Sequence, residues 1–500
     1  MVFHTDDYKN RVLGCWMGKN IGGTLGMPME WQRRMNDVTF YPESVINAGT
    51  ALANDDLDLQ LIWLVAMEEK GIDIDSALLG EYWLACITPH WGEYGIGKAN
   101  MRAGLMPPLS GMADNPTKDS NGAWIRSEIW ACVAPGCPGV AVRYAYEDAI
   151  VDHGDGEGVY SAVFCAAVES AAFVERDVYK LIDIGLSYIP EDCGTAQAIA
   201  CAIACCRAGK TWRQARDELM THHRGQCPPW ALISDEDRAK GFADGKLGYD
   251  APLNIALIII GWLYGEEDFE KSLLIIINCG EDTDCTAGTF AAIYGIIHGI
   301  NGIPEKWKAP IGRAIKTISL NLGDLGYMGD LLPRDIDELT DRTYHIAVKV
   351  LAQHAPHVRF TGDAPDSTEA GEMKSLSHGA DLYPCQRGPI TKTAFMDVMT
   401  DYPDGVFARD GQPICVRLKV IRKHRIPQGL NLRIYTPDGW MVSPSKRGKI
   451  NAGEWVTLRF TAQEVPENVN RFAAEVTVDG TATVVLAPLV LLNGNLRGPE

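Results

Sequence analysis

Residues 278–288 read Asn-Cys-Gly-Glu-Asp-Thr-Asp-Cys-Thr-Ala-Gly and stand between the apolar runs Leu273–Ile277 and Ala291–Ile297. Asp282 and Asp284 therefore lie one residue apart between two segments that favour helix. If both carboxylates are buried, they need a compensating positive charge, and a metal ion is the obvious candidate. An ordinary solvated turn would carry the same residues. The stretch by itself leaves both interpretations open.

The composition predicts a soluble globular protein. Hydrophobic residues make up 46% and charged residues 22% of the 500 positions, and the net charge is -19. This charge repels phosphate backbones and anionic membranes, so we expect no nucleic-acid or membrane partner. The first residues lack the features of a secretory signal, and no apolar run reaches the roughly 20 residues that span a bilayer.

The 14 cysteines stand mostly within apolar helical patterns and nowhere form a Cys-x-x-Cys motif. Buried, reduced thiols in a cytosolic protein explain this distribution better than a disulfide framework or a zinc site. We therefore expect a cytoplasmic location.

The first predicted helix, residues 8–26, carries glycine at every fourth position from 14 to 26. This spacing places the glycines on one face, where they allow another helix to approach very closely. The following Met-Pro-Met breaks the helix and presents Glu30 from a constrained turn. The glycines predict a tight helix crossing, and Glu30 is a candidate catalytic carboxylate.

Another predicted helix begins at Asn54-Asp55-Asp56. Asn54 or Asp55 is a suitable N-cap, and acidic residues in a first turn interact favourably with the helix dipole. Capping accounts for one of these residues but does not require all three. A site built at the start of this helix therefore remains open.

Residues 88–121 show little periodicity and many turn formers, which predicts a long loop. His90, Trp91 and Tyr94 within it are candidates for a wall that faces the substrate. Exposed aromatic residues that simply pack the loop down are an equally good explanation.

A glycine-rich link at residues 152–158 joins two predicted helices made largely of small and apolar residues. His153 and Gly156 in this link are candidate substrate contacts. A single histidine is more often structural, with its ring bound to a backbone carbonyl, so the assignment has a plain structural alternative.

Helical patterns continue to residue 353, and Gly, Pro, Asp and Ser dominate residues 354–384. Beyond them, residues 414–420 and 455–461 alternate between apolar and polar, and Asp479-Gly480 marks a hairpin. The chain exceeds what one hydrophobic core usually serves. We predict a mainly α protein with an all-helical domain at 1–355, a linker at 356–385 and a small antiparallel β-sandwich at 386–500.

Five acidic residues stand at predicted helix ends: Glu30, Asp55, Asp56, Asp282 and Asp284. If they converge, they form an oxygen-rich, highly charged site that suits Mg²⁺ or Mn²⁺. Thr283 or Asn54 and water would complete the coordination. Convergence is the hypothesis, because spacing alone does not establish it.

Four ordered motifs resemble those of the ADP-ribosylglycohydrolase family, over roughly residues 8 to 320. Residues 18–30 resemble the family's glycine-rich opening helix and its Gly-x-Pro-x-Glu, and residues 54–56 resemble its Thr-Asp-Asp. Residues 145–172 are similar to its central region around a histidine, and residues 282–285 resemble its Asp-Thr-Asp-Thr.

The resemblance implies an all-helical fold and a magnesium-dependent active site, often with two ions. Asp55, Asp56, Asp282 and Asp284 would be metal ligands, together with Asn54 in the place of the family's threonine. Glu30 would be a gating or acid/base carboxylate. Cys285 stands where the family has a second threonine, and a thiol is a poor ligand for Mg²⁺. Whether one ion or two bind is left open.

The predicted function is that of a Mg²⁺-dependent glycohydrolase, with Mn²⁺ as the alternative ion, that cleaves a glycosidic bond at C1 of a ribose or similar furanose. The substrate would be an ADP-ribosyl or furanosyl glycoside, free or linked to a protein, and Glu30, Asp55 or Asp56 would transfer protons. Two alternatives remain: a metal-independent glycosidase using Glu30 with Asp55 or Asp56, and a non-catalytic binding protein. Oligomerisation through the β domain is also open.

Overall fold

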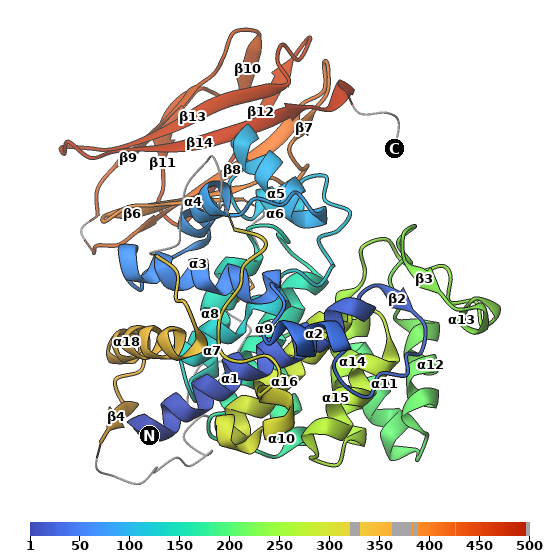
Figure 1. Ribbon diagram of the computed structural model, residues 1–500. Helices are drawn as coiled ribbons and strands as arrows, with labels where there is room; N and C mark the ends of the chain where they lie inside the picture. Colours follow the sequence, from blue (N-terminus) through green and yellow to red (C-terminus); the bar gives the residue numbers. More distant parts are fainter. Residues whose placement is uncertain (321–330, 363–381, 384–387, 426, 497–500) are drawn as a thin grey trace. The chain divides into compact units, whose positions relative to one another are not determined.

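The computed structural model describes residues 1–320, 331–362, 382–383, 388–425 and 427–496, which form two compact units (Figure 1). The helical unit comprises residues 1–98 and 115–382, and the β unit comprises residues 99–114 and 383–500. Helices dominate the first unit, and strands in sheets dominate the second. The predicted fold class is confirmed.

The helical unit begins with a short strand and a long helix and ends with a strand that pairs with the first. Its first half contains β1 (Val2–His4), α1 (Thr5–Gly26), the 3₁₀ helix η1 (Met27–Met29), β2 (Gln32–Arg33), α2 (Glu43–Ala48), α3 (Asp55–Lys70), α4 (Ser76–Cys86), the start of α5 (Gly92–Ala103), η2 (Trp124–Arg126), α7 (Glu128–Val133), α8 (Pro138–Ala149) and α9 (Glu157–Ala171). Its second half contains α10 (Val178–Leu186), α11 (Gly194–Arg207), α12 (Trp212–His222), β3 (Leu232–Ile233), α13 (Asp235–Ala239), α14 (Ala251–Tyr264), α15 (Phe269–Cys279), α16 (Thr283–Gly302), α17 (Glu305–Lys308), α18 (Ile336–His354) and β4 (Arg359–Thr361).

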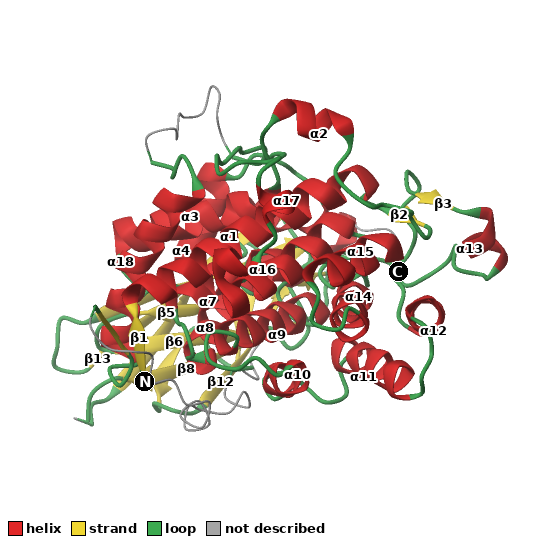
Figure 2. Ribbon diagram, turned by 60° about the horizontal axis from the view of Figure 1, so that its bottom comes forward, coloured by secondary structure: helices red, strands yellow, loops and turns green. Residues whose placement is uncertain are grey.

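Helices α1 and α16 run side by side in the middle of the helical unit (Figure 2). Their backbones touch directly, because a Cβ atom at Gly18 would collide with the backbone of Ala291, and one at Gly22 would collide with Ala287. A Cβ at Gly26 would likewise collide with Thr283. The predicted tight crossing is confirmed. It places the end of α1 directly against the start of α16.

The β unit contains two five-stranded sheets. One has the order β10-β12-β8-β6-β5, and the other has the order β11-β9-β13-β14-β7. Neighbouring strands are antiparallel except for β7 and β14. The strands are β5 (Ile390–Lys392), β6 (Met396–Asp401), β7 (Phe407–Ala408), β8 (Ile414–Arg422), β9 (Leu430–Tyr435), β10 (Trp440–Ser443), β11 (Arg447–Ile450), β12 (Trp455–Ala462), β13 (Val469–Val478) and β14 (Val484–Asn493).

Both sheets contribute to one hydrophobic core. Val416 of β8 and Leu458 of β12 lie in the same cluster as Val476 of β13 and Leu489 of β14. Strand β8 alternates between buried and partly exposed side chains, as its sequence predicts. The predicted turn at residues 479–480 lies in the connection from β13 to β14.

The stretch 88–121 is not the long loop that its sequence predicts, because it contains α5 and α6 (Leu109–Met112). The buried face of α5 includes Tyr94, Gly97, Lys98 and Met101, which follow helical spacing. A glycine and a lysine on that face hide its periodicity, since neither scores as apolar. The Lys98 ammonium is buried, and its hydrogen bond to the carbonyl of Ile87 at 2.8 Å offsets part of the cost of removing it from water.

Residues 99–114 belong to the β unit. Leu105, Leu109 and Ala113 lie in its hydrophobic core, and the Arg471 guanidinium of β13 donates to the Ala103 carbonyl at 2.6 Å. The domain boundaries at 355 and 385 stay predictions, and most of the predicted linker 356–385 lies outside the described residues. Within it, β4 pairs in parallel with β1.

Among the residues that the structure describes, no helix combines the length and the apolar character that crossing a bilayer requires.

We predict that Gly18→Ala lowers the free energy of unfolding of the helical unit by at least about 2 kcal/mol, because the added methyl group meets backbone that cannot rotate away. Gly362→Ala is the control, since no atom of the described residues lies within 4 Å of a Cβ there. Chemical denaturation of both variants measures the effect, and equal stabilities would contradict the backbone contact.

We also predict that Leu109→Ala destabilises the β unit by about 2 to 5 kcal/mol, the usual cost of truncating a buried leucine. Hydrogen exchange of the amides of β8 and β14 reports on this unit specifically. Leu496→Ala is the control, because Leu496 is exposed. Faster exchange confined to the helical unit would contradict the assignment of residues 99–114.

Candidate active and metal site

Acidic residues from three distant parts of the sequence meet in the helical unit. Glu30 follows η1, Asp55 and Asp56 open α3, and Asp282 and Asp284 stand at the start of α16. Oxygen atoms of Glu30, Asp282 and Asp284 all lie within 4.8 Å of one another. A second group, Asp56, Asp284 and the Cys285 thiol, meets the same limit, so Asp284 belongs to both.

Glu30 is held beside Asp282 by a clamp between two chain segments. The Trp31 amide donates to the Glu281 carbonyl at 2.8 Å, and the Glu281 amide donates to the Gln32 carbonyl at 3.0 Å. The buried Arg33 guanidinium donates to both carboxylate oxygens of Glu281, each at 2.8 Å. A bidentate ion pair of this kind fixes the orientation of the two side chains as well as the distance between them. It ties the turn after α1 to the residues that precede α16.

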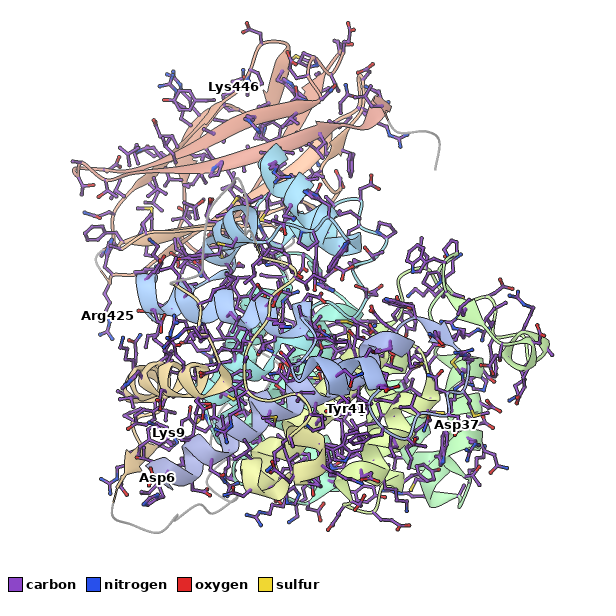
Figure 3. The ribbon with its side chains drawn as sticks, in the orientation of Figure 1. Asp6, Lys9, Asp37, Tyr41, Arg425 and Lys446 are labelled. Atoms are coloured by element: carbon purple, nitrogen blue, oxygen red, sulfur yellow. The ribbon has the colours of Figure 1, made fainter. Side chains whose placement is uncertain are left out.

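The same two segments need a glycine at position 280. Gly280 has φ 81°, and a Cβ atom there would collide with the Arg34 carbonyl. Farther along the first segment, Figure 3 labels Asp37 and Tyr41 on the chain that leads from β2 to α2. The Tyr41 hydroxyl donates to the Trp307 carbonyl at 2.9 Å, which anchors that chain to α17.

Asn54 links the two pairs of aspartates. Its Oδ1 accepts from the Asp56 amide at 2.9 Å, which caps α3, and its Nδ2 donates to Asp284 Oδ2 at 3.1 Å. The starts of α3 and α16 therefore both face the acidic residues, and helix dipoles favour negative charge at that end. Asn54 lies where a ligand would be, although its oxygen already serves as the helix cap.

Asp282 is oriented by two asparagines. Asn121 Nδ2 donates to Asp282 Oδ2 at 2.6 Å, and the Asp282 amide donates to Asn254 Oδ1 at 3.3 Å. The remaining oxygens, Asp282 Oδ1 and Asp284 Oδ1, are buried and accept no hydrogen bond within the described residues. Buried anionic oxygens without donors are costly, and they fit a hard divalent cation with oxygen ligands.

The electrostatics agree with this geometry. Burial, together with repulsion from Asp284 and Asp55, raises the pKa of Glu30 to about 9. Burial and the charge of Asp284 raise the pKa of Asp55 to about 6. Burial and the charges of Asp284 and Glu30 also raise the pKa of Asp282 well above its usual value. The groups that the structure describes therefore leave the negative charge at this point uncompensated.

Asp56 differs from the other acids because a cation of the protein lies beside it. The Lys19 ammonium of α1 is 3.1 Å from Asp56 Oδ2 and 2.8 Å from Glu128 Oε1. Burial alone would lower the pKa of Lys19, but attraction to Asp56 and Glu128 outweighs it and raises the pKa above its usual value. The Cys285 thiol donates to the other oxygen, Asp56 Oδ1, at 3.5 Å.

One of the aromatic candidates, Tyr94, contacts Asp55. The Tyr94 hydroxyl donates to Asp55 Oδ2 at 3.0 Å, and the ring centroids of Tyr94 and Trp91 are 6.3 Å apart. Trp91 is 51% exposed, and His90 next to it is also exposed. An exposed indole next to the Tyr94 ring offers a face on which a ring of a substrate can stack. The roles of His90 and Trp91 stay predictions.

His153 is fully buried among polar side chains. Its Nδ1 lies 2.9 Å from Asp152 Oδ1, and its Nε2 lies 3.4 Å from Ser120 Oγ and 3.9 Å from Glu93 Oε1. Gly156 precedes α9, and its Cα faces Asp119, whose Oδ1 accepts from the Glu157 amide at 2.8 Å. The part of the chain around His153 and Gly156 is therefore well ordered by its own contacts, and their contact with substrate stays a prediction.

Sequence reasoning missed three residues of the site: Lys19, Asn121 and Glu128. Lys19 had a visible signal, because it is a charged residue within a helix of small and apolar residues that was expected to pack tightly. For Asn121 and Glu128 the local sequence gives no such signal, because the residues that they contact are far away in the sequence.

Without metal, Glu30 should make the protein less stable as the pH rises. Its folded pKa of about 9 lies above the ordinary value of 4.5, so its contribution is fully present below about pH 4.5 and is lost as the pH rises through about 9. We expect Glu30→Gln to gain stability over the wild type across this range, measured by denaturation in EDTA. Glu81→Gln, at an exposed position of α4, is the control, and a pH-independent difference would contradict the shift.

Comparison with known proteins identifies the family of this chain. A solved structure described as an "ADP-ribosylglycohydrolase-related protein complex" is similar at 15% identity, over 68% of this chain and 99% of that chain, with a TM-score of 0.44. No curated protein matches the chain significantly. The model of the ADP-ribosylglycohydrolase family matches residues 4–347, more than half of the sequence. The chain therefore belongs to the ADP-ribosylglycohydrolase family, a family of glycoside-cleaving hydrolases.

Proposed function

We propose that this protein is a metal-dependent glycohydrolase that hydrolyses a glycosidic bond at C1 of a ribose or similar furanose. One observation carries the proposal: Glu30, Asp282 and Asp284 converge, and two of their buried oxygens, Asp282 Oδ1 and Asp284 Oδ1, have no donor among the described residues. Membership of a hydrolase family supports the class of reaction.

Mg²⁺ is the proposed ion, with Mn²⁺ as the alternative, because the converging side chains offer carboxylate oxygens. When bound, such an ion neutralises the acidic residues and acts as a Lewis acid on oxygens of the substrate. Asp282, Asp284 and Glu30 would hold it. Asp55, Asp56 and Asn54, which the family pattern also places among the ligands, stand at the adjoining start of α3.

Asp55 is the proposed general base. Its pKa of about 6 is close to neutrality, which suits a group that accepts a proton from water during the reaction. The hydrogen bond from Tyr94 holds one of its oxygens in place. In the reaction, the bond from C1 to the leaving atom breaks, the water oxygen binds C1, and Asp55 takes the proton of that water.

Glu30 has the complementary property. Without the ion, a Glu30 carboxyl whose pKa is raised to about 9 carries its proton at neutral pH and can donate it to the leaving atom. With the ion bound, Glu30 is a ligand instead, and the leaving atom receives the proton that Asp55 takes from the water. The surrounding carboxylates stabilise the positive charge that develops on the sugar ring in an oxocarbenium-like transition state. Trp91, exposed beside Tyr94, supplies an apolar face for the substrate.

The same separation of pKa values favours a second candidate, a metal-independent glycosidase in which Glu30 is the acid and Asp55 the base. Dialysis against EDTA distinguishes the two. The metal-dependent enzyme loses turnover and regains it with Mg²⁺, whereas the two-carboxylate enzyme is unaffected.

A screen of ADP-ribosyl and furanosyl glycosides, with and without Mg²⁺, tests the proposed activity. Release of the free sugar from at least one class, dependent on the metal, is the expected result. A protein that binds such glycosides without turnover under any condition would refute the enzymatic proposal and favour a binding role.

We predict that Asp284→Ala weakens Mg²⁺ binding at least about 100-fold with little loss of stability, because it removes a ligand and a repelling charge together. Calorimetric titration measures the affinity. The control is Asp58→Asn on α3, whose carboxylate accepts from the backbone amides of Ile318 and Ser319 instead of facing the acidic residues. Unchanged Mg²⁺ affinity of Asp284→Ala would refute the ligand assignment.

A further inference from the structure

The two groups of candidate ligands are chemically different. Glu30, Asp282 and Asp284 form a group of carboxylates only, whereas the group of Asp56, Asp284 and Cys285 includes a thiol. The first has two buried oxygens without donors. In the second, Asp56 Oδ2 also accepts no hydrogen bond among the described residues, but the Lys19 ammonium lies 3.1 Å from it as an ion pair, and Asp56 Oδ1 accepts from the Cys285 thiol.

Lys19 is surrounded by three oxygens. Its ammonium forms ion pairs with Asp56 at 3.1 Å and Glu128 at 2.8 Å, and it donates a hydrogen bond to the Thr289 hydroxyl at 3.2 Å. The side chains of Lys19, Asp56 and Glu128 are 1%, 2% and 0% exposed. At this depth, the ammonium and the carboxylates depend on one another, since removing one charge leaves the other uncompensated.

The helix crossing holds this ammonium in place. Lys19 follows Gly18, which touches the backbone of α16, so the lysine stem runs along that helix. A Cβ atom at Gly288 would lie 3.3 Å from Lys19 Cδ and 3.4 Å from Asp56 Oδ2. The glycine at position 288 therefore leaves the space in which the lysine and the aspartate meet.

We infer that the Lys19 ammonium takes the place of a second metal ion, so that this chain binds one divalent cation, at Glu30, Asp282 and Asp284. This inference rests on the proposed function. A cation at Asp56, Asp284 and Cys285 would have to approach the Lys19 ammonium, and like charges repel strongly at this depth. It would also need a thiol as a ligand, which Mg²⁺ accepts poorly. Lys19 supplies positive charge to Asp56 permanently, whereas the other group depends on an ion from solution.

The number of ions bound by the whole chain tests the inference directly. Titration of the metal-free protein with Mn²⁺, followed by calorimetry and electron paramagnetic resonance, should give one ion per chain and the spectrum of an isolated ion. Lys19→Met keeps the length of the side chain but removes its charge, and it should raise the number to two, with a spectrum broadened by coupling between neighbouring ions.

Lys98→Met is the matched control, because Lys98 is equally buried but donates to backbone carbonyls, and it should keep one ion per chain. Two coupled ions in the wild type would overturn the inference and leave the proposed function standing. No ion in the wild type would overturn both. If Lys19→Met folds, as judged by circular dichroism, and still binds one ion, Lys19 is not what excludes the second. If Lys19→Met does not fold, the number of ions that the wild type binds tests the inference by itself.

Discussion

The contact between the backbones of α1 and α16 is the constraint on which the rest of the site depends. Four glycines of α1 remove every side chain from one face, so α16 approaches until backbone meets backbone. The Thr283 hydroxyl then donates to the Gly26 carbonyl at 2.8 Å, which joins the end of one helix to the start of the other. Glu30, four residues after Gly26, and Asp284, next to Thr283, are brought together as a direct consequence.

Close packing of this kind brings carboxylates into the interior, and each must be balanced by positive charge or by a proton. Lys19 shares one positive charge between Asp56 and Glu128, and Arg33 pairs with Glu281. Among the residues that the structure describes, no lysine or arginine forms an ion pair with Asp282 or Asp284. The pKa of Glu30 is raised for the same reason. Burial and the neighbouring carboxylates favour its protonated form when no cation is bound.

The ion pair between Arg33 and Glu281 helps to hold the uncompensated carboxylates in a defined geometry. Like charges separate unless the backbone that carries them is held, and here the segments 30–34 and 280–284 are joined by backbone hydrogen bonds and a buried ion pair. The acidic residues therefore stay close together at a cost that the surrounding contacts offset. A preorganised site of this kind has little to rearrange when a ligand binds.

Local sequence by itself determined many of the elements and several of their ends, although it did not reveal α5 and α6. Helical periodicity, the cap at Asn54 and the glycine spacing of α1 act within a few residues, and the alternation in β8 does the same, so all of them could be predicted. The family motifs further predicted which acidic residues belong together. The tertiary structure decided what no local pattern encodes: that Lys19 pairs with Glu128, that Asn121 orients Asp282, and that residues 99–114 join the β unit. The physical reason is that these are contacts between distant residues, whose partners are chosen by the packing of whole helices rather than by the neighbouring sequence.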